Sequence, residues 1–118
     1  MLVQQYEPAI ESEGELSAVF LHGRLSHVVR KMPQEGQFKV QENYGGTASP
    51  EERADWIDRY GSRVLGLLPA PPAYARVDLV ARGGSRPVLM ELELIEPDLF
   101  LRLAPEAAVQ TYLDLALA

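Results

Sequence analysis

Three acidic residues stand at unusual positions, inside two strand-like segments in the second half of the chain. Asp78 lies in the first segment, and Glu91 and Glu93 lie in the second. Side chains alternate between the two faces of a strand, so Glu91 and Glu93 share one face. The intervening Arg82-Gly83-Gly84-Ser85 predicts a hairpin turn, which brings Asp78 alongside. The spacing therefore predicts three carboxylates on one face of a sheet.

Such a cluster of carboxylates has a specific chemical use. Because like charges repel, it is unfavourable unless a cation neutralises it. Oxygen ligands with open coordination positions favour Mg²⁺ or Mn²⁺, which proteins usually bind together with substrate phosphates. The alternative is an ordinary half-exposed strand whose glutamates face solvent. Acidic residues paired across a hairpin are unfavourable in such a strand, and this favours the interpretation as a metal site.

Cationic residues earlier in the chain supply what a phosphate group needs. Arg30 and Lys31 close one strand-like segment, and Lys39 lies in the next short one. The loop Asn43–Thr47 contains paired glycines and can offer backbone N–H groups. Cations and fixed dipoles that face a metal site are the arrangement used in phosphoryl transfer. The alternative for Arg30 and Lys31 is solubility at the end of a strand.

Short strands separated by Gly- and Pro-containing breaks must position these residues. The turn His22-Gly23-Arg24 separates two runs rich in apolar and β-forming residues, which predicts a hairpin. We interpret His22 and His27 as surface or hairpin side chains. A solvated turn is expected at 11–15. The predicted strands are residues 16–22, 25–31, 37–41, 74–81 and 87–95, with residues 1–6 as a further short strand.

Two helices complete the predicted fold. Ser49 can cap the first helix, Pro50 suits its first position, and Glu52 follows three residues after the cap. Apolar residues then recur at helical spacing up to Leu68. The second helix is expected from about 105 to 117. The order β-β-β-α-β-β-α indicates an α+β fold, an antiparallel sheet with two helices on one face.

Length and composition exclude several classes of protein. The chain has 118 residues, of which 47% are hydrophobic and 24% charged, as in one ordinary globular domain. No apolar run approaches the roughly 20 residues that span a bilayer, and the first residues show no signal-peptide pattern. The net charge of −6 gives no broad basic surface for nucleic acid. The absence of cysteine excludes thiolate chemistry and fits a cytoplasmic protein.

Four short motifs, taken in order, resemble ATP-grasp enzymes of the prokaryotic glutathione synthetase type. The segment Gln4–Ile10 is similar to the adenine-binding hinge of that family. The hairpin with Arg30, the segment Phe38–Gln41 and the glycine pair at 45–46 follow in the family order. Asp78 and then Glu91-Leu92-Glu93 are similar to its metal ligands, an Asp followed by Glu-x-Asn. The resemblance runs from residue 1 to about residue 117.

The resemblance implies a reaction and a role for each matched residue. In this family ATP phosphorylates a carboxylate, and an amine then attacks the acyl phosphate. The implied partners are therefore ATP, a carboxylate and an amine. The implied roles are Gln4, Gln5, Tyr6 and Leu92 at the adenine, Arg30 and Lys39 at the transferred phosphate or substrate, and Asp78, Glu91 and Glu93 as ligands of Mg²⁺ or Mn²⁺.

The resemblance covers only the C-terminal part of such an enzyme. The N-terminal domain and the first half of the ATP-binding region have no counterpart in residues 1–118, so we expect a C-terminal ATP-grasp lobe that is inactive alone. Glu93 replaces the family's Asn, and Lys39 replaces an Arg. One alternative is a non-catalytic interaction module that pairs with itself or another chain through exposed strand edges. A metal-dependent nuclease is disfavoured by the acidic charge and by Glu rather than Lys at position 93.

Overall fold

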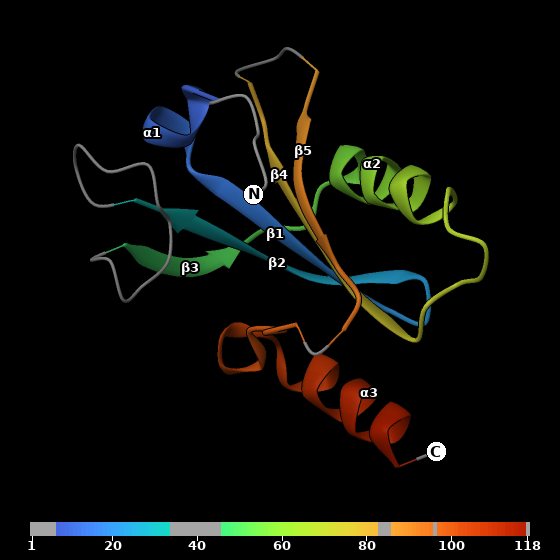
Figure 1. Ribbon diagram of the computed structural model, residues 1–118. Helices are drawn as coiled ribbons and strands as arrows, with labels where there is room; N and C mark the ends of the chain where they lie inside the picture. Colours follow the sequence, from blue (N-terminus) through green and yellow to red (C-terminus); the bar gives the residue numbers. More distant parts are fainter. Residues whose placement is uncertain (1–6, 34–45, 83–85, 96, 118) are drawn as a thin grey trace.

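The computed structural model describes residues 7–33, 46–82, 86–95 and 97–117 (Figure 1). In this part of the chain, five strands form one antiparallel sheet in the order β3-β2-β1-β4-β5. The α+β class is thereby confirmed. The elements are α1 (Ala9–Glu13), β1 (Glu15–Leu21), β2 (Arg24–Met32), β3 (Thr47–Glu51), α2 (Asp55–Leu65), β4 (Tyr74–Val80), β5 (Val88–Glu93), the 3₁₀ helix η2 (Leu101–Leu103) and α3 (Glu106–Ala116).

The central strand β1 divides the apolar core into two layers. All seven of its residues are buried, because it pairs on both edges and is covered on both faces. Phe20 and its alternate neighbours pack with Ile57 and Leu65 of α2, on what we call the α2 face. Val19 and Leu21 point the other way and pack with Leu99 and with side chains of α3, on what we call the α3 face. Tyr74, Leu101, Tyr112 and Leu115 complete this second layer.

The two long helices therefore cover opposite faces of the sheet, and the prediction of two helices on one face is wrong. The apolar side chains of β1 point to both faces, so each face needs a cover to exclude water. After β5, the segment 97–104 leads to α3, which packs on the face of the sheet opposite α2. Figure 1 shows the two helices on separate parts of the sheet.

The third strand and the first long helix begin later than predicted. Residues Thr47–Glu51 form β3, which pairs with β2 and places Pro50 opposite Val29. Pro is tolerated in an edge strand because its missing N–H can face outward. The helix α2 begins only at Asp55, so the interpretation of Ser49 as its cap is wrong. The predicted strand at 37–41 lies outside the described residues.

The acidic run at 11–15 forms part of a short helix and the start of β1 rather than a solvated turn. Gly14 ends α1 with φ 74, and its N–H donates to the carbonyl of Ile10 over 3.0 Å. A Cβ at this position would overlap the backbone oxygen of Lys31, so the turn requires glycine. The predicted C-terminal helix is confirmed as α3. None of the described helices is long and apolar enough to cross a membrane.

Candidate functional site

The register of the sheet gathers the predicted carboxylates on the α3 face. Asp78 of β4 lies opposite Glu91 of β5, and Arg76 lies opposite Glu93. On its other side Asp78 lies opposite Ser17 of β1. The prediction that three carboxylates share one face is confirmed.

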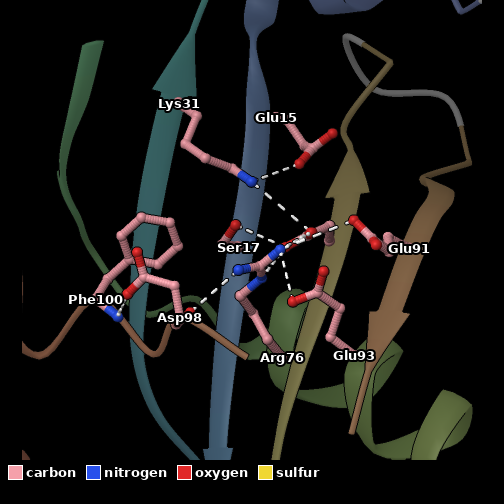
Figure 2. A network of polar contacts seen from close by, with 9 residues as sticks. Glu15, Ser17, Lys31, Arg76, Glu91, Glu93, Asp98 and Phe100 are labelled. Atoms are coloured by element: carbon pink, nitrogen blue, oxygen red, sulfur yellow. Dashed lines mark hydrogen bonds and ion pairs between the residues drawn. The ribbon is translucent and has the colours of Figure 1, made fainter. Parts of the chain in front are cut away.

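The guanidinium of Arg76 contacts all three carboxylates, and Figure 2 shows it beside Glu91 and Glu93. Its Nη2 is 2.9 Å from Asp78 Oδ2, 3.1 Å from Glu93 Oε2 and 3.8 Å from Glu91 Oε2. A cluster of acids needs a cation, and in this structure that cation is Arg76. Arg76 was not predicted as a site residue, although the same alternation places it two positions before Asp78, on the same face.

Asp78 is fully buried and both of its oxygens are engaged. Ser17 Oγ donates to Asp78 Oδ1 over 2.6 Å, and Arg76 Nε donates to the same oxygen over 3.0 Å. Its Oδ2 accepts from Arg76 Nη2 and lies 3.7 Å from Lys31 Nζ. The surrounding donors therefore satisfy the oxygens of this buried side chain.

Lys31 is the second cation of this face. Its Nζ lies 2.6 Å from Glu15 Oε1, and both side chains are buried. Burial raises the pKa of Glu15 more than the charge of Lys31 lowers it. Together, Glu15, Lys31, Arg76, Asp78, Glu91 and Glu93 form what we call the charge network.

A β-bulge explains why Lys31 rather than Arg30 belongs to the charge network. Val19 pairs with His27 and Phe20 pairs with Leu25, so Ser26 is an extra residue in β2. The extra residue reverses which side chains beyond it point to a given face. Arg30 therefore lies opposite Leu16, whose side chain belongs to the α2 face.

Two other predicted site residues, Arg30 and Leu92, lie away from the charge network and make structural contacts. Arg30 pairs with Glu51 and donates to the carbonyl of Glu13, so the structure does not bring it to the carboxylates. Leu92 packs against the core of the α2 face, on the other side of β5. Gln4, Gln5, Tyr6 and Lys39 lie outside the described residues.

Glu7 is the first described residue of the predicted adenine hinge, and it makes a structural contact with Arg82. Glu7 is buried and its Oε2 accepts a hydrogen bond from Arg82 Nε over 2.8 Å. This pair ties the start of the described chain to the end of β4.

Glu91 and Glu93 are the accessible members of the charge network. Their side chains are 54% and 31% exposed, whereas Asp78 is fully buried. Burial and the hydrogen bond and charge of Glu93 raise the pKa of Glu91 to about 7. Four carboxylates face two cations in this network, an excess of two negative charges when all are ionised.

Residues 98–100, which follow β5, contact the cations of the charge network. Arg76 Nη1 donates to the carbonyl of Asp98 over 3.1 Å. Asp98 Oδ1 accepts the N–H of Phe100 over 2.9 Å. The ring of Phe100 has three cations around it, at 5.7 Å for Lys31 Nζ and 5.5 Å for Cζ of both Arg76 and Arg102. Beside it, a groove of about 280 Å³ lies between residues 97–102 and Tyr112.

His27 belongs to the predicted hairpin, but it is buried and anchors the same segment, so its interpretation as a surface side chain is wrong. It is 3% exposed, and its Nε2 lies 2.7 Å from the carbonyl oxygen of Leu99. Since a carbonyl only accepts, Nε2 carries the proton and Nδ1 accepts from Ser26 Oγ over 2.8 Å. Burial lowers the pKa of His27, which favours this neutral form.

The carboxylates suit a hard divalent cation by their chemistry. Oxygen donors with excess negative charge are what Mg²⁺ and Mn²⁺ bind. The guanidinium of Arg76 occupies the space between them, however. Among the residues that the structure describes, no three acidic or histidine side chains are arranged to hold a metal ion.

Comparison with known proteins adds one sequence relative. No protein-family model matches the chain. The cycloserine biosynthesis protein DcsG of Streptomyces lavendulae is 29% identical over 118 residues, covering 93% of this chain and 39% of that protein. The chain therefore spans about two fifths of the length of this relative.

Comparison with solved structures shows the fold. The crystal structure of D-cycloserine synthetase DcsG superposes with a TM-score of 0.74, at 24% identity over 96% of this chain and 40% of that chain. D-alanine–D-alanine ligase from Bacillus anthracis, complexed with ATP, gives 0.61 at 15% identity over 87% of this chain and 38% of that chain. The ATP-grasp ligase PsnB with a minimal precursor gives 0.60 at 13% identity over 88% and 34%. The chain has the fold of part of an ATP-grasp ligase, which confirms the resemblance at the level of the fold; the likeness to glutathione synthetase stays a prediction.

Proposed function

We propose that this chain is the C-terminal, metal- and nucleotide-binding portion of an ATP-dependent carboxylate–amine ligase that acts through an acyl phosphate. The fold shared with ATP-grasp ligases, one of them complexed with ATP, supports the proposal. The observation that carries it is the charge network, with four carboxylates facing two cations on one side of the sheet. Bound Mg²⁺ would offset its two excess negative charges.

Glu91 and Glu93 would hold the cation first. They are the accessible carboxylates of the network, and the hydrogen bond and charge of Glu93 add to the burial that raises the pKa of Glu91. Asp78 would join them only if Arg76 released it, because Ser17 and Arg76 already occupy its oxygens. The metal would neutralise negative charge on the phosphate oxygens of ATP.

Lys31 and Arg76 would take the phosphate-binding role that the resemblance assigns to Arg30. Both lie on the face of the carboxylates, while Arg30 serves the contact between β2 and β3. Two cations held in a water-poor layer stabilise the negative charge of a phosphoryl group. Their contribution is position and charge, with no covalent enzyme intermediate. Lys39 keeps its predicted role at the phosphate or substrate.

The adenine would lie outside the charge network. Gln4, Gln5 and Tyr6 keep their predicted roles around it. An adenine packed on Leu92 would have to lie on the α2 face of β5, which is the face that carries neither Glu91 nor Glu93.

Titration of the chain with MnCl₂ and with Mg·ADP in a calorimeter tests the proposal. We expect weak, saturable binding that Glu91→Gln weakens about tenfold or more, because the variant removes a charged oxygen ligand. Glu52→Gln removes an exposed acid before α2 and is the matched control. Unchanged binding in Glu91→Gln would contradict the metal site, and full ATP turnover by the chain alone would contradict the view that it is only part of an enzyme.

A non-catalytic module that associates with itself is the second candidate. Leu113 and Leu117 are 44% and 84% exposed at the C-terminal helix, and the outer edges of β3 and β5 pair with no other strand among the residues that the structure describes. Exposed apolar side chains and strand edges are typical of surfaces that meet another chain. Sedimentation velocity decides, because a monomer at millimolar concentration excludes self-association as the function.

A further inference from the structure

The ring of Phe100 is surrounded by an unusual number of cations. Lys31 Nζ, Arg76 Cζ and Arg102 Cζ lie 5.5 to 5.7 Å from its centroid. Phe100 itself is only 7% exposed, and Lys31 and Arg76 are also buried. A cation near an aromatic ring is attracted by the negative charge on the ring faces, and more strongly where water is excluded.

The backbone at Phe100 is held in a strained conformation. Its φ of 52° and ψ of 41° lie in the left-handed region, which is unfavourable for a side chain of this size. Hydrogen bonds on three successive residues hold it there, from Arg76 to the carbonyl of Asp98, from His27 to the carbonyl of Leu99 and from Phe100 N–H to Asp98. Strain that is held so firmly is characteristic of functional sites.

The two buried cations have carboxylates on one side and the ring on the other. Lys31 contacts Glu15 and Asp78, and Arg76 contacts Asp78, Glu91 and Glu93. Figure 2 shows Phe100 beside Lys31 and Arg76, with the glutamates of β5 on the far side of Arg76. Each long side chain would otherwise have several rotamers, and the ring favours those that point into the network.

We infer that Phe100 is a positioning residue, whose ring keeps the ends of Lys31 and Arg76 directed into the charge network. This inference rests on the proposed function for the use made of the two cations. It does not make Phe100 a catalytic residue, because the ring acts through the two side chains that it orients. A leucine would fill much of the same space but would lack the charge distribution of the ring.

Fluorinated phenylalanines at position 100 provide the direct test. Each added fluorine weakens the negative charge on the ring faces while the shape of the side chain changes little. The Nε–H of Arg76 donates to Asp78, so its NMR signal and its exchange with water report the position of the guanidinium. Loss of the signal in Arg76→Lys assigns it. We expect exchange to accelerate stepwise, by about fivefold to tenfold over the series.

Phe20 is the matched control for this series. Its ring is fully buried on the α2 face, where it packs against Gly61. The same fluorinated residues at position 20 should leave the exchange of Arg76 unchanged within about twofold, because a general effect on stability would appear at both positions. Equal acceleration at the two positions, or no trend at position 100, would overturn the inference.

Substitutions of Phe100 by other standard amino acids test the role of the ring independently. Phe100→Trp keeps an aromatic face and should preserve the Arg76 signal, whereas Phe100→Leu should lose its protection even where the melting temperatures match. Protection retained in Phe100→Leu would contradict the inference. Titration of Mg·ADP into the wild-type chain separates the two proposals: absence of nucleotide binding contradicts the proposed function, while the exchange of Arg76 still decides the role of the ring.

Discussion

Glu91 is the residue of the charge network whose protonation changes near neutral pH. Burial and the neighbouring Glu93 raise its pKa to about 7, so the folded chain binds more protons than the unfolded chain between about pH 4.5 and 7. The contribution of Glu91 to stability is therefore complete below about pH 4.5 and is lost as the pH rises through 7. In Glu91→Gln this decline should largely disappear, as measured by melting temperature against pH in metal-free buffer.

Two further residues bear on the pH dependence of the melting temperature: Glu52 as a control and Glu15 as a second acid with a raised pKa. Glu52→Gln should keep the wild-type pH dependence, because this exposed acid lies outside the charge network. Glu15 also has a raised pKa, so a smaller decline in the same direction remains in Glu91→Gln. If wild type and Glu91→Gln show the same slope, Glu91 does not carry the protonation change.

Ser17 supports the charge network from the centre of the sheet. It is fully buried, and its hydroxyl donates to Asp78 over 2.6 Å. Ser17→Ala would leave a buried carboxylate oxygen with one donor fewer, which lowers the free energy of unfolding by about 1–3 kcal/mol. Urea denaturation measures the loss. Ser62→Ala removes an exposed bond to Asp58 of 3.1 Å and should stay within about 0.5 kcal/mol, and a Ser17→Ala effect as small as that would argue against the bond.

At the scale of elements, Gly61 sets how closely α2 approaches the sheet. It is buried in the middle of the helix, where a Cβ would overlap the ring of Phe20. Gly61→Ala gains up to about 1 kcal/mol of helix propensity, but the overlap forces α2 away from β1. We expect a net loss of about 1–3 kcal/mol in the free energy of unfolding.

Gly66→Ala provides the control for that substitution. Gly66 follows the last turn of α2 with an ordinary helical φ of −65°, so the change should be within about 0.5 kcal/mol. Chemical denaturation of both variants makes the comparison. A stabilised Gly61→Ala would show that the ring of Phe20 has room to move.

The elements that local patterns determine were predicted, and those that depend on distant contacts were not. Alternating side chains and glycine-containing breaks in the sequence predict the pairing of β1 with β2 and of β4 with β5, and Pro105 marks the start of α3. The sequence around Ser49 and Pro50 fits a helix cap as well as an edge strand, and only the pairing with β2 decides. The face chosen by α3 depends on the path of residues 97–104, which no short motif specifies.

The same distinction holds in the candidate site. A period of two placed Asp78, Glu91 and Glu93 on one face correctly, and it could also have found Arg76. Without the bulge at Ser26, a two-residue turn would have put Arg30 opposite Glu15. The bulge places Lys31 at that position instead, and no pattern in the neighbouring sequence predicts the bulge.

On the scale of the whole molecule, the two faces of one sheet have different tasks. The α2 face is an apolar core that stabilises the fold. The α3 face combines an apolar layer with buried charges that add little net stability, since desolvation opposes their attraction. Under the proposed function, a bound divalent cation would offset the negative charge of this network.

A divalent cation should therefore stabilise the entire fold. A ligand that binds only the folded chain adds RT ln(1 + [L]/Kd), about 2.7 kcal/mol at a hundredfold excess over Kd. For a domain of this size we expect MnCl₂ or MgCl₂ at a hundredfold excess over Kd to raise the melting temperature by roughly 10 °C. The double variant Glu91→Gln/Glu93→Gln should lose this rise, and NaCl at equal ionic strength should not produce it. A rise of equal size in the double variant or with NaCl would mean that general screening of the −6 net charge, rather than a site on the α3 face, stabilises the molecule.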